Sequence, residues 1–157
     1  MSKKIVLKSL LAVVMVGFVL SLSSCKKDEK KIIGKWKYEK IEVKNLVCSD
    51  PTKTNELKSK IEQFQNAFIG MVSEVEFTED GKMITRGLLG GEDQTSSYKV
   101  KDGKIIVNDE ASDLSFSGKK MYWERDMDKE TLEGLAMFFG EDAEITKCTM
   151  RATLTKK

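Results

Sequence analysis

The chain contains no histidine, a single proline and only three cysteines among its 157 residues. Without histidine it lacks the side chain that most often acts as a general base near neutral pH, and it cannot form Ser-His or Cys-His nucleophile pairs. Most zinc sites are excluded as well, because imidazole is a common ligand in them. We therefore expect a protein that is not an enzyme and that holds no cofactor.

Carboxylates are plentiful, but none of them follows a catalytic or metal-binding pattern. Glu92-Asp93 and Glu141-Asp142 would act as an acid/base pair only if a cleft brought two carboxyls ~5–9 Å apart. The segment from Asp126 begins like a calcium-binding loop, but Thr131 stands where that loop needs glycine and Met137 where it needs glutamate. The sequence predicts no metal site.

The one long apolar run lies near the start of the chain. Residues 1–24 combine a head with three lysines, an apolar run over residues 9–20 and small residues at the end, which is the pattern of a secretory signal. The run is too short for a spanning helix, which needs ~20 residues. We interpret 1–24 as a signal peptide; a permanent anchor helix or a buried core helix is the alternative.

Removal of that segment changes the charge balance. The whole chain has 27 basic and 25 acidic residues, and three lysines but no acid lie within residues 1–24. Residues 25–157 therefore carry 24 basic and 25 acidic side chains, a net charge of −1. A nucleic-acid partner is not expected, because such binding needs a clustered basic surplus.

The signal ends on Leu22-Ser23-Ser24-Cys25, which resembles the lipobox of bacterial lipoproteins. The resemblance implies cleavage before Cys25, acylation of its sulfur and new amino group, and attachment to the outer membrane. Stable attachment needs two or more acyl chains, because one chain anchors only marginally. The alternative is a third structural cysteine at this position.

A charged run follows, over residues 26–31, and we interpret residues 25–32 as the lipidated cysteine and its tether. The run is either a solvated linker or a sorting signal, since lysines and acids directly after the cysteine resemble the surface-export signal of Bacteroidetes lipoproteins. Both the periplasmic face and the cell-surface face of the membrane remain open.

The remaining residues, 33–157, are enough for one domain with a proper core. Alternating apolar residues and glycine-containing turns predict eight strands. Their expected ranges are 33–44, 74–78, 83–86, 95–100, 104–108, 113–117, 120–125 and 144–155. The phase of the first strand changes near Lys40, which indicates a bulge.

Two helices interrupt this series. Leu57, Ile61, Phe64 and Phe68 form an apolar stripe within residues 49–71, where either Asp50 or Thr54 could cap the helix. A second, shorter helix is expected over residues 129–139. Each stripe either packs on the fold or binds a partner; in the second helix, Met137 and Phe138 lie partly outside the apolar face.

Sequential hairpins with one apolar face predict a mainly β fold, an eight-stranded up-and-down antiparallel barrel. It has one helix between the first two strands and a short one before the last strand. Gly34-Lys35-Trp36 at the head of the first strand resembles the G-x-W signature of lipocalins, and the whole resembles the lipocalin-like domains of Bacteroidetes lipoproteins. That resemblance implies an arginine from the last strand over Trp36, for which Arg151 is the candidate.

Such a barrel encloses either packed side chains or one small ligand. The first alternative is a structural or interaction protein with a filled barrel and an envelope protein as partner; the second is a module that binds a small apolar ligand. Aromatic side chains would line the ligand site in the second case and fill the core in the first: Trp36, Tyr38, Phe77, Tyr98, Phe116 and Trp123.

Cys48 and Cys148 remain once Cys25 is lipidated. Cys48 lies just beyond the expected first strand and Cys148 near the start of the last, so antiparallel pairing of these strands would bring the two close together. An exported chain meets conditions that permit disulfides. A disulfide and two buried free thiols are both compatible with the sequence.

Overall fold

A computed structural model describes residues 27–72, 74–86, 91–139 and 142–157. The predicted signal peptide, the predicted lipidation site Cys25 and the Glu141 carboxyl lie outside the described residues.

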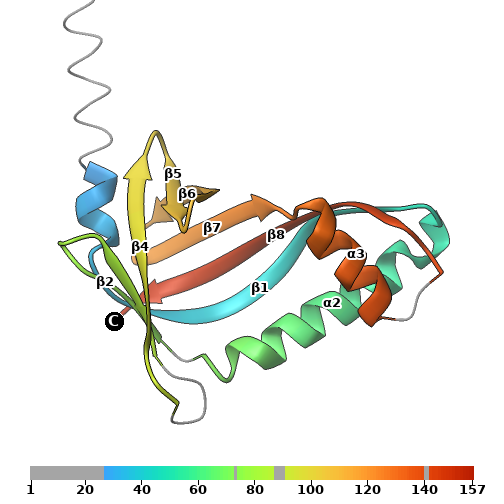
Figure 1. The fold of residues 1–157 in the computed structure, drawn as a ribbon, viewed down its shortest axis with the longest axis horizontal. Helices are drawn as coiled ribbons and strands as arrows, with labels where there is room; N and C mark the ends of the chain where they lie inside the picture. The colour runs from blue at the N-terminus through green and yellow to red at the C-terminus, as the bar shows by residue number, and fades with distance from the viewer. Residues whose placement is uncertain (1–26, 73, 87–90, 140–141) are drawn as a thin grey trace, which may run out of the picture.

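The fold is an antiparallel barrel in which each strand pairs with the next and the last closes on the first (Figure 1). The predicted fold class is therefore confirmed, including both interrupting helices. The strands are β1 (Gly34–Cys48), β2 (Glu74–Phe77), β3 (Lys82–Thr85), β4 (Gln94–Lys101), β5 (Lys104–Val107), β6 (Glu110–Ser117), β7 (Lys120–Asp126) and β8 (Ile145–Lys156).

Tight turns with left-handed residues join the middle strands. Gly81 and Gly103 have φ of 78° and 71° in two of the predicted hairpin turns. Asn108 and Asp109 form the link between β5 and β6 with φ of 49° and 68°. Two positive φ values in a row match the type I′ turn, whose twist suits paired strands.

Two bulges shape β1. Its pairing with β8 slips between Tyr38 and Lys40 and again between Val43 and Asn45, so Glu39 and Lys44 are extra residues on β1. The first bulge is the one predicted near Lys40. The second was not predicted, and it extends the strand to Cys48 instead of ending it at Lys44.

The bulges keep the apolar side chains of β1 on one side. Tyr38, Ile41, Val43 and Leu46 lie opposite four residues of β8 that are two positions apart, namely Leu154, Ala152, Met150 and Cys148. Residues two apart on a strand share a face, and directly opposed residues share it too. The β1–β8 ribbon therefore has one continuous apolar face.

That face serves two hydrophobic cores. The barrel core surrounds Trp36, with Phe77, Ile105, Met121 and Leu154 nearly or fully inaccessible. The second core covers the far half of the ribbon, where Val43, Cys148 and neighbouring residues pack against the two helices. Both cores draw residues from β1 and β8, so these strands connect them.

Helix α2 (Thr54–Ile69) follows a short 3-10 turn, η1 (Pro51–Lys53). Asp50 caps the 3-10 turn by accepting from the Thr52 amide at 2.9 Å, whereas α2 itself begins after Lys53 without a side-chain cap, so neither Asp50 nor Thr54 caps α2 directly. The first half of the predicted stripe, Leu57 and Ile61, is fully buried, which confirms packing there. The second half remains exposed, at 40% for Phe64 and 48% for Phe68.

Helix α3 (Lys129–Phe138) begins at Asp128, whose carboxylate accepts from the Thr131 amide at 2.8 Å. Leu132 is buried in the second core, while Met137 and Phe138 are exposed. The Phe138 ring lies 4.9 Å from that of Phe64 on α2. Among the described residues, no helix combines the length and apolar character needed to cross a membrane.

Residues 27–32, within the expected tether, are helical and lie against the barrel end at which β1 begins (Figure 1). Ile32 is fully buried in the barrel core, and its carbonyl accepts from Trp36 Nε1 at 2.6 Å. Lys156 of β8 lies over the Trp36 ring, with Nζ 5.4 Å from the centroid.

The cation over Trp36 is thus Lys156 and not the predicted Arg151. Arg151 Nε donates to Glu124 at 2.6 Å, and the Arg151 guanidinium lies 5.6 Å from the Tyr122 ring centroid. The register explains the difference, because Lys156 pairs with Trp36, whereas Arg151 pairs with Glu42 further up the ribbon.

Cys48 and Cys148 are free, buried thiols, so the disulfide considered from the sequence is not present. Cys148 lies opposite Leu46, two residues from Cys48, and the pair are therefore diagonal neighbours. Diagonal positions are roughly 7–8 Å apart, beyond the usual Cα separation of a disulfide. Instead, Cys48 Sγ contacts the Asp50 carbonyl at 2.9 Å and Thr54 Oγ1 at 3.2 Å.

Candidate functional site

A cavity of about 370 Å³ lies where the barrel meets the two helices. It is an open cleft between the inner faces of β1, β6, β7 and β8 and the helices, with Gln65 of α2 and Thr131 and Leu135 of α3 at its border. Its lining is mainly apolar, with a few polar side chains: Tyr38, Ile41, Gln65, Ser112, Trp123, Arg125, Met127, Thr131, Leu135, Met150 and Ala152.

Tyr38 is the most distinctive residue of this cavity. Burial raises the pKa of Tyr38 to about 12, since the phenolate would lose its hydration. The hydroxyl makes no hydrogen bond to any residue in the described part of the chain. Tyr38 is partly buried, and its hydroxyl is open to water and to a bound molecule.

Trp123 forms the boundary between cavity and core. Its ring lies 6.4 Å from Phe77, in the barrel core, while the same side chain lines the cavity. Its indole N–H, like the polar groups of Gln65 and Ser112, has no hydrogen-bond partner among the residues that the structure describes. Several donors therefore surround an otherwise apolar space.

The six aromatic residues predicted from the sequence divide into two groups. Tyr38 and Trp123 line the cavity. Trp36, Phe77, Tyr98 and Phe116 pack in or against the barrel core, with Phe77 and Tyr98 edge to face at 5.0 Å. The Tyr98 hydroxyl donates to the Thr78 carbonyl at 2.9 Å, which fixes it to the turn after β2. These four residues fill the barrel interior, and a separate hollow of about 470 Å³ lies between residues 29–33 and β4, with Tyr98 in its wall.

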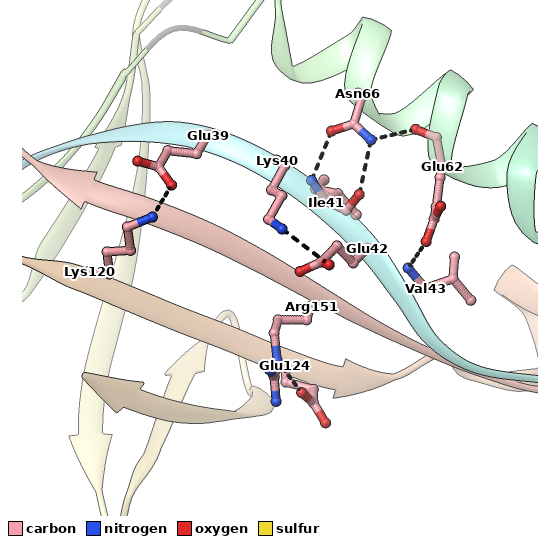
Figure 2. Close-up of polar contacts among 10 residues, drawn as sticks. All are labelled: Glu39, Lys40, Ile41, Glu42, Val43, Glu62, Asn66, Lys120, Glu124 and Arg151. Atoms are coloured by element: carbon pink, nitrogen blue, oxygen red, sulfur yellow. Dashed lines mark hydrogen bonds and ion pairs between the residues drawn. The ribbon is translucent and has the colours of Figure 1, made fainter. Parts of the chain in front are cut away.

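Helix α2 is held at the mouth through the free edge of β1, which pairs with β2 only as far as Lys37. Figure 2 shows Asn66 facing the backbone of Ile41. Its Oδ1 accepts from the Ile41 amide and its Nδ2 donates to the Ile41 carbonyl, both at 2.9 Å. Glu62 accepts from the Val43 amide at 2.8 Å. These side chains take the place of a neighbouring strand and position Gln65 over the cavity.

Among the described residues, Arg125 is the only charged side chain that lines the cavity. Its guanidinium donates to Glu110 at the surface, so its charge is already balanced on that side. No acidic residue lines the cavity. This arrangement suits a molecule that is apolar with one or two hydrogen-bonding groups, and it does not suit a cation.

Of the acidic residues considered as catalysts or as the start of a calcium loop, those that the structure describes are exposed: Glu92, Asp93, Asp126 and Asp142. Asp93 is paired with Arg86 at 2.5 Å on the surface, and Asp126 accepts from Thr149. In the described part of the chain, no three acidic or cysteine side chains are placed to hold a metal ion.

Most of the apolar lining was not predicted as functional. Met127, Leu135 and Met150 come from a loop, a helix and a strand, and in its own segment each has the pattern of an ordinary core residue.

Comparisons with family models, with curated proteins and with solved structures find no match to this chain.

Proposed function

We propose that this protein is a lipid-anchored lipoprotein of the outer membrane and that it binds a small, largely apolar molecule at the mouth of its barrel without catalysing a reaction. The observation that carries the proposal is the cavity beneath α2 and α3 with the unpartnered Tyr38 hydroxyl in its wall.

The cavity has the features of a small-molecule site. Such sites occupy ~300–1,000 Å³ and combine apolar walls with a few polar groups that orient the ligand. Here a volume of about 370 Å³ is walled by aliphatic, methionine and aromatic side chains. Methionines such as Met127 and Met150 adapt to differently shaped ligands.

The polar groups indicate the kind of ligand. A hydroxyl, carbonyl or amide oxygen on the ligand would pair with Tyr38 and with the donors of Trp123 and Gln65. Desolvated polar groups weaken binding when they stay unpaired, so these side chains favour an amphipathic molecule over a pure hydrocarbon. The proposed ligand is a compact apolar molecule with a neutral polar end.

The binding test uses N-phenyl-1-naphthylamine, a neutral apolar fluorophore, as probe. Ala152 lines the cavity, so Ala152→Phe should fill it and weaken probe binding by at least about tenfold. Ala111→Phe places the same ring on the exposed face of β6 and should leave binding unchanged. Equal probe affinity in the wild type and Ala152→Phe would exclude this cavity as the site.

Native mass spectrometry of the protein purified from its own cells is the second test. A retained small molecule in the wild type, lost in Ala152→Phe, would give the mass of the natural ligand.

The lipid anchor is supported by the signal pattern of residues 1–24 and by the lipobox-like residues that end at Cys25. Cys25→Ser should move the protein from the membrane fraction to the soluble fraction, whereas Cys148→Ser should leave it in the membrane. Protease treatment of intact cells then distinguishes the cell-surface face from the periplasmic face. Retention of Cys25→Ser in the membrane would refute the anchor.

A structural or interaction protein is the second candidate, favoured by the filled barrel interior and by the exposed Phe138 and Met137. If the second candidate is right, native mass spectrometry finds no bound small molecule on the purified protein, and the fluorophore does not bind. The same two experiments therefore separate the candidates.

A further inference from the structure

Charged residues are sorted along the barrel although the domain is almost neutral. The end at which β1 begins comprises residues 27–35, the turns 78–82, 101–104 and 117–120, and the final residues 155–157. We call this the basal end. Its segments contain eleven basic and five acidic side chains, a net charge of +6.

The opposite end carries the reverse charge. It comprises residues 49–56, the described residues of the β3–β4 link, the β5–β6 turn with Glu110, and residues 125–139 and 142–144. These segments contain twelve acidic and four basic side chains, a net charge of −8. The cavity lies toward this acidic end, beneath α2 and α3.

Several basal lysines have no acid to balance them. Lys27, Lys30, Lys101 and Lys119 are exposed and form no ion pair with any residue that the structure describes. Lys101 lies directly opposite Lys104 across the β4–β5 hairpin. Like charges in such positions repel each other. Lys104 is balanced by Asp113 at 2.8 Å, whereas Lys101 forms no ion pair with any described residue.

Other basal lysines are paired with three acids outside the segments counted: Glu74 binds Lys157 and Lys35, Glu39 binds Lys120, and Asp113 binds Lys104. With these three acids included, the net charge of the basal end is +3.

The basal end is also the end from which the chain continues toward Cys25. Only Lys26 separates Cys25 from the helical segment that begins at Lys27. That segment is fixed to the barrel, because Ile32 is buried and Lys156 Nζ donates to the Lys31 carbonyl at 3.0 Å. Two residue steps span at most ~7 Å, which is less than the ~8 Å screening length at physiological ionic strength.

We propose that the basal end binds the anionic headgroups of a membrane surface, so that the barrel stands on the membrane with its acidic end and cavity toward the water. In the cell, the orientation of the barrel on the membrane depends on the proposed lipid anchor at Cys25. The counter-charge is the lipid phosphate, because only Lys26 lies between Cys25 and residues 27–32, which are fixed to the barrel. The net charge of −8 at the far end would be repelled from the same surface.

The test uses residues 25–157 with Cys25→Ser, so that neither the signal nor an acyl chain contributes. Every strand and both cores lie within residues 27–157, so this part contains the complete fold. Binding is measured by cosedimentation with vesicles of phosphatidylcholine alone and of equal parts phosphatidylcholine and phosphatidylglycerol. We expect binding to the anionic vesicles only, and its loss at high salt.

Two charge-reversal variants show whether vesicle binding depends on the basal end or only on the net charge of the protein. Lys101→Glu with Lys119→Glu should weaken binding to the anionic vesicles by at least about tenfold, since each membrane-facing lysine contributes roughly fivefold. Lys53→Glu with Lys129→Glu changes the net charge equally at the acidic end and should weaken it much less. Circular dichroism confirms that both variants fold.

Three results would overturn the proposal: no binding to anionic vesicles, equal weakening in both double variants, or binding to duplex DNA without binding to vesicles. None of them bears on the fluorophore assay or on fractionation of the lipidated chain, so failure here is distinguishable from failure of the proposed function.

Discussion

At the scale of single residues, Tyr38 links the fold to the proposed binding site. Its ring belongs to the apolar face of β1, and its hydroxyl is one of the polar groups of the cavity that have no hydrogen-bond partner among the described residues. A tyrosine buried in this way is costly to ionise, so it gives the protein a measurable dependence on alkaline pH.

We predict that the free energy of unfolding falls as the pH rises from about 10 to about 12. The Tyr38 pKa is about 12 in the folded protein against the ordinary 10.0, so the unfolded chain loses this proton first. The fall is at most about 1.4 kcal/mol per pH unit for one group. Urea unfolding across this range measures it.

Tyr38→Phe is the control for that measurement and should reduce the slope. Burial also raises the pKa of Tyr98, so a smaller slope remains in the variant. An identical slope in both proteins would show that Tyr38 is not buried as described.

We also predict that Cys148 is unreactive in the folded protein. Burial, with a smaller effect of the Asp126 charge, raises the pKa of Cys148 to about 11, so the thiolate that reacts with iodoacetamide is scarce near pH 8. Alkylation should therefore modify Cys148 only after denaturation. Peptide mass mapping measures this, and a gain of two hydrogens on reduction would contradict the free thiols.

At the scale of elements, the contact between α2 and β1 decides the shape of the barrel mouth. A free strand edge exposes amide and carbonyl groups, and covering it with a helix is one way in which proteins protect it. In this protein, Asn66 and Glu62 satisfy the backbone of Ile41 and Val43 directly.

Asn66→Ala should therefore destabilise the protein by about 1–3 kcal/mol, the cost of leaving partly buried backbone groups unpaired. Asn55→Ala is the matched control, because Asn55 lies exposed in the first turn of the same helix and should change stability much less. Denaturant unfolding measures both. An effect of Asn66→Ala no larger than that of Asn55→Ala would contradict the role of this edge contact.

At the scale of the whole molecule, two hydrophobic cores share one pair of strands. The barrel core and the second core meet along the continuous face of β1 and β8. Shared strands should couple the cores, so that the barrel and the helices unfold together.

We predict that Leu57→Ala, in the second core, lowers the unfolding midpoint of the barrel as well. Leu57 is fully buried, and truncation of a buried leucine costs about 2–5 kcal/mol. Trp36 and Trp123 report the barrel by fluorescence, and far-ultraviolet circular dichroism reports α2 and α3. The two signals should shift together, as they should for Met121→Ala in the barrel core. A fluorescence midpoint unchanged by Leu57→Ala would show two independent units.

The sequence by itself determined the number and order of the strands, the two helices and the positions of most turns. These features depend on local patterns, such as the alternation of Leu114 with Phe116 and the glycine at position 103. The lack of histidine is likewise evident from the sequence alone, and from it we predict that the protein carries out no imidazole-dependent chemistry.

Only the tertiary structure decided which aromatic residues fill the core and which line a cavity, and which cation lies over Trp36. Both depend on the register between β1 and β8, whose paired residues Trp36 and Lys156 lie more than a hundred positions apart. The same is true of charge, since an almost neutral sequence becomes a molecule with one basic and one acidic end only when the turns are brought together. Local sequence patterns fix the conformation of a segment, whereas the pairing of distant segments is set by packing across the whole barrel.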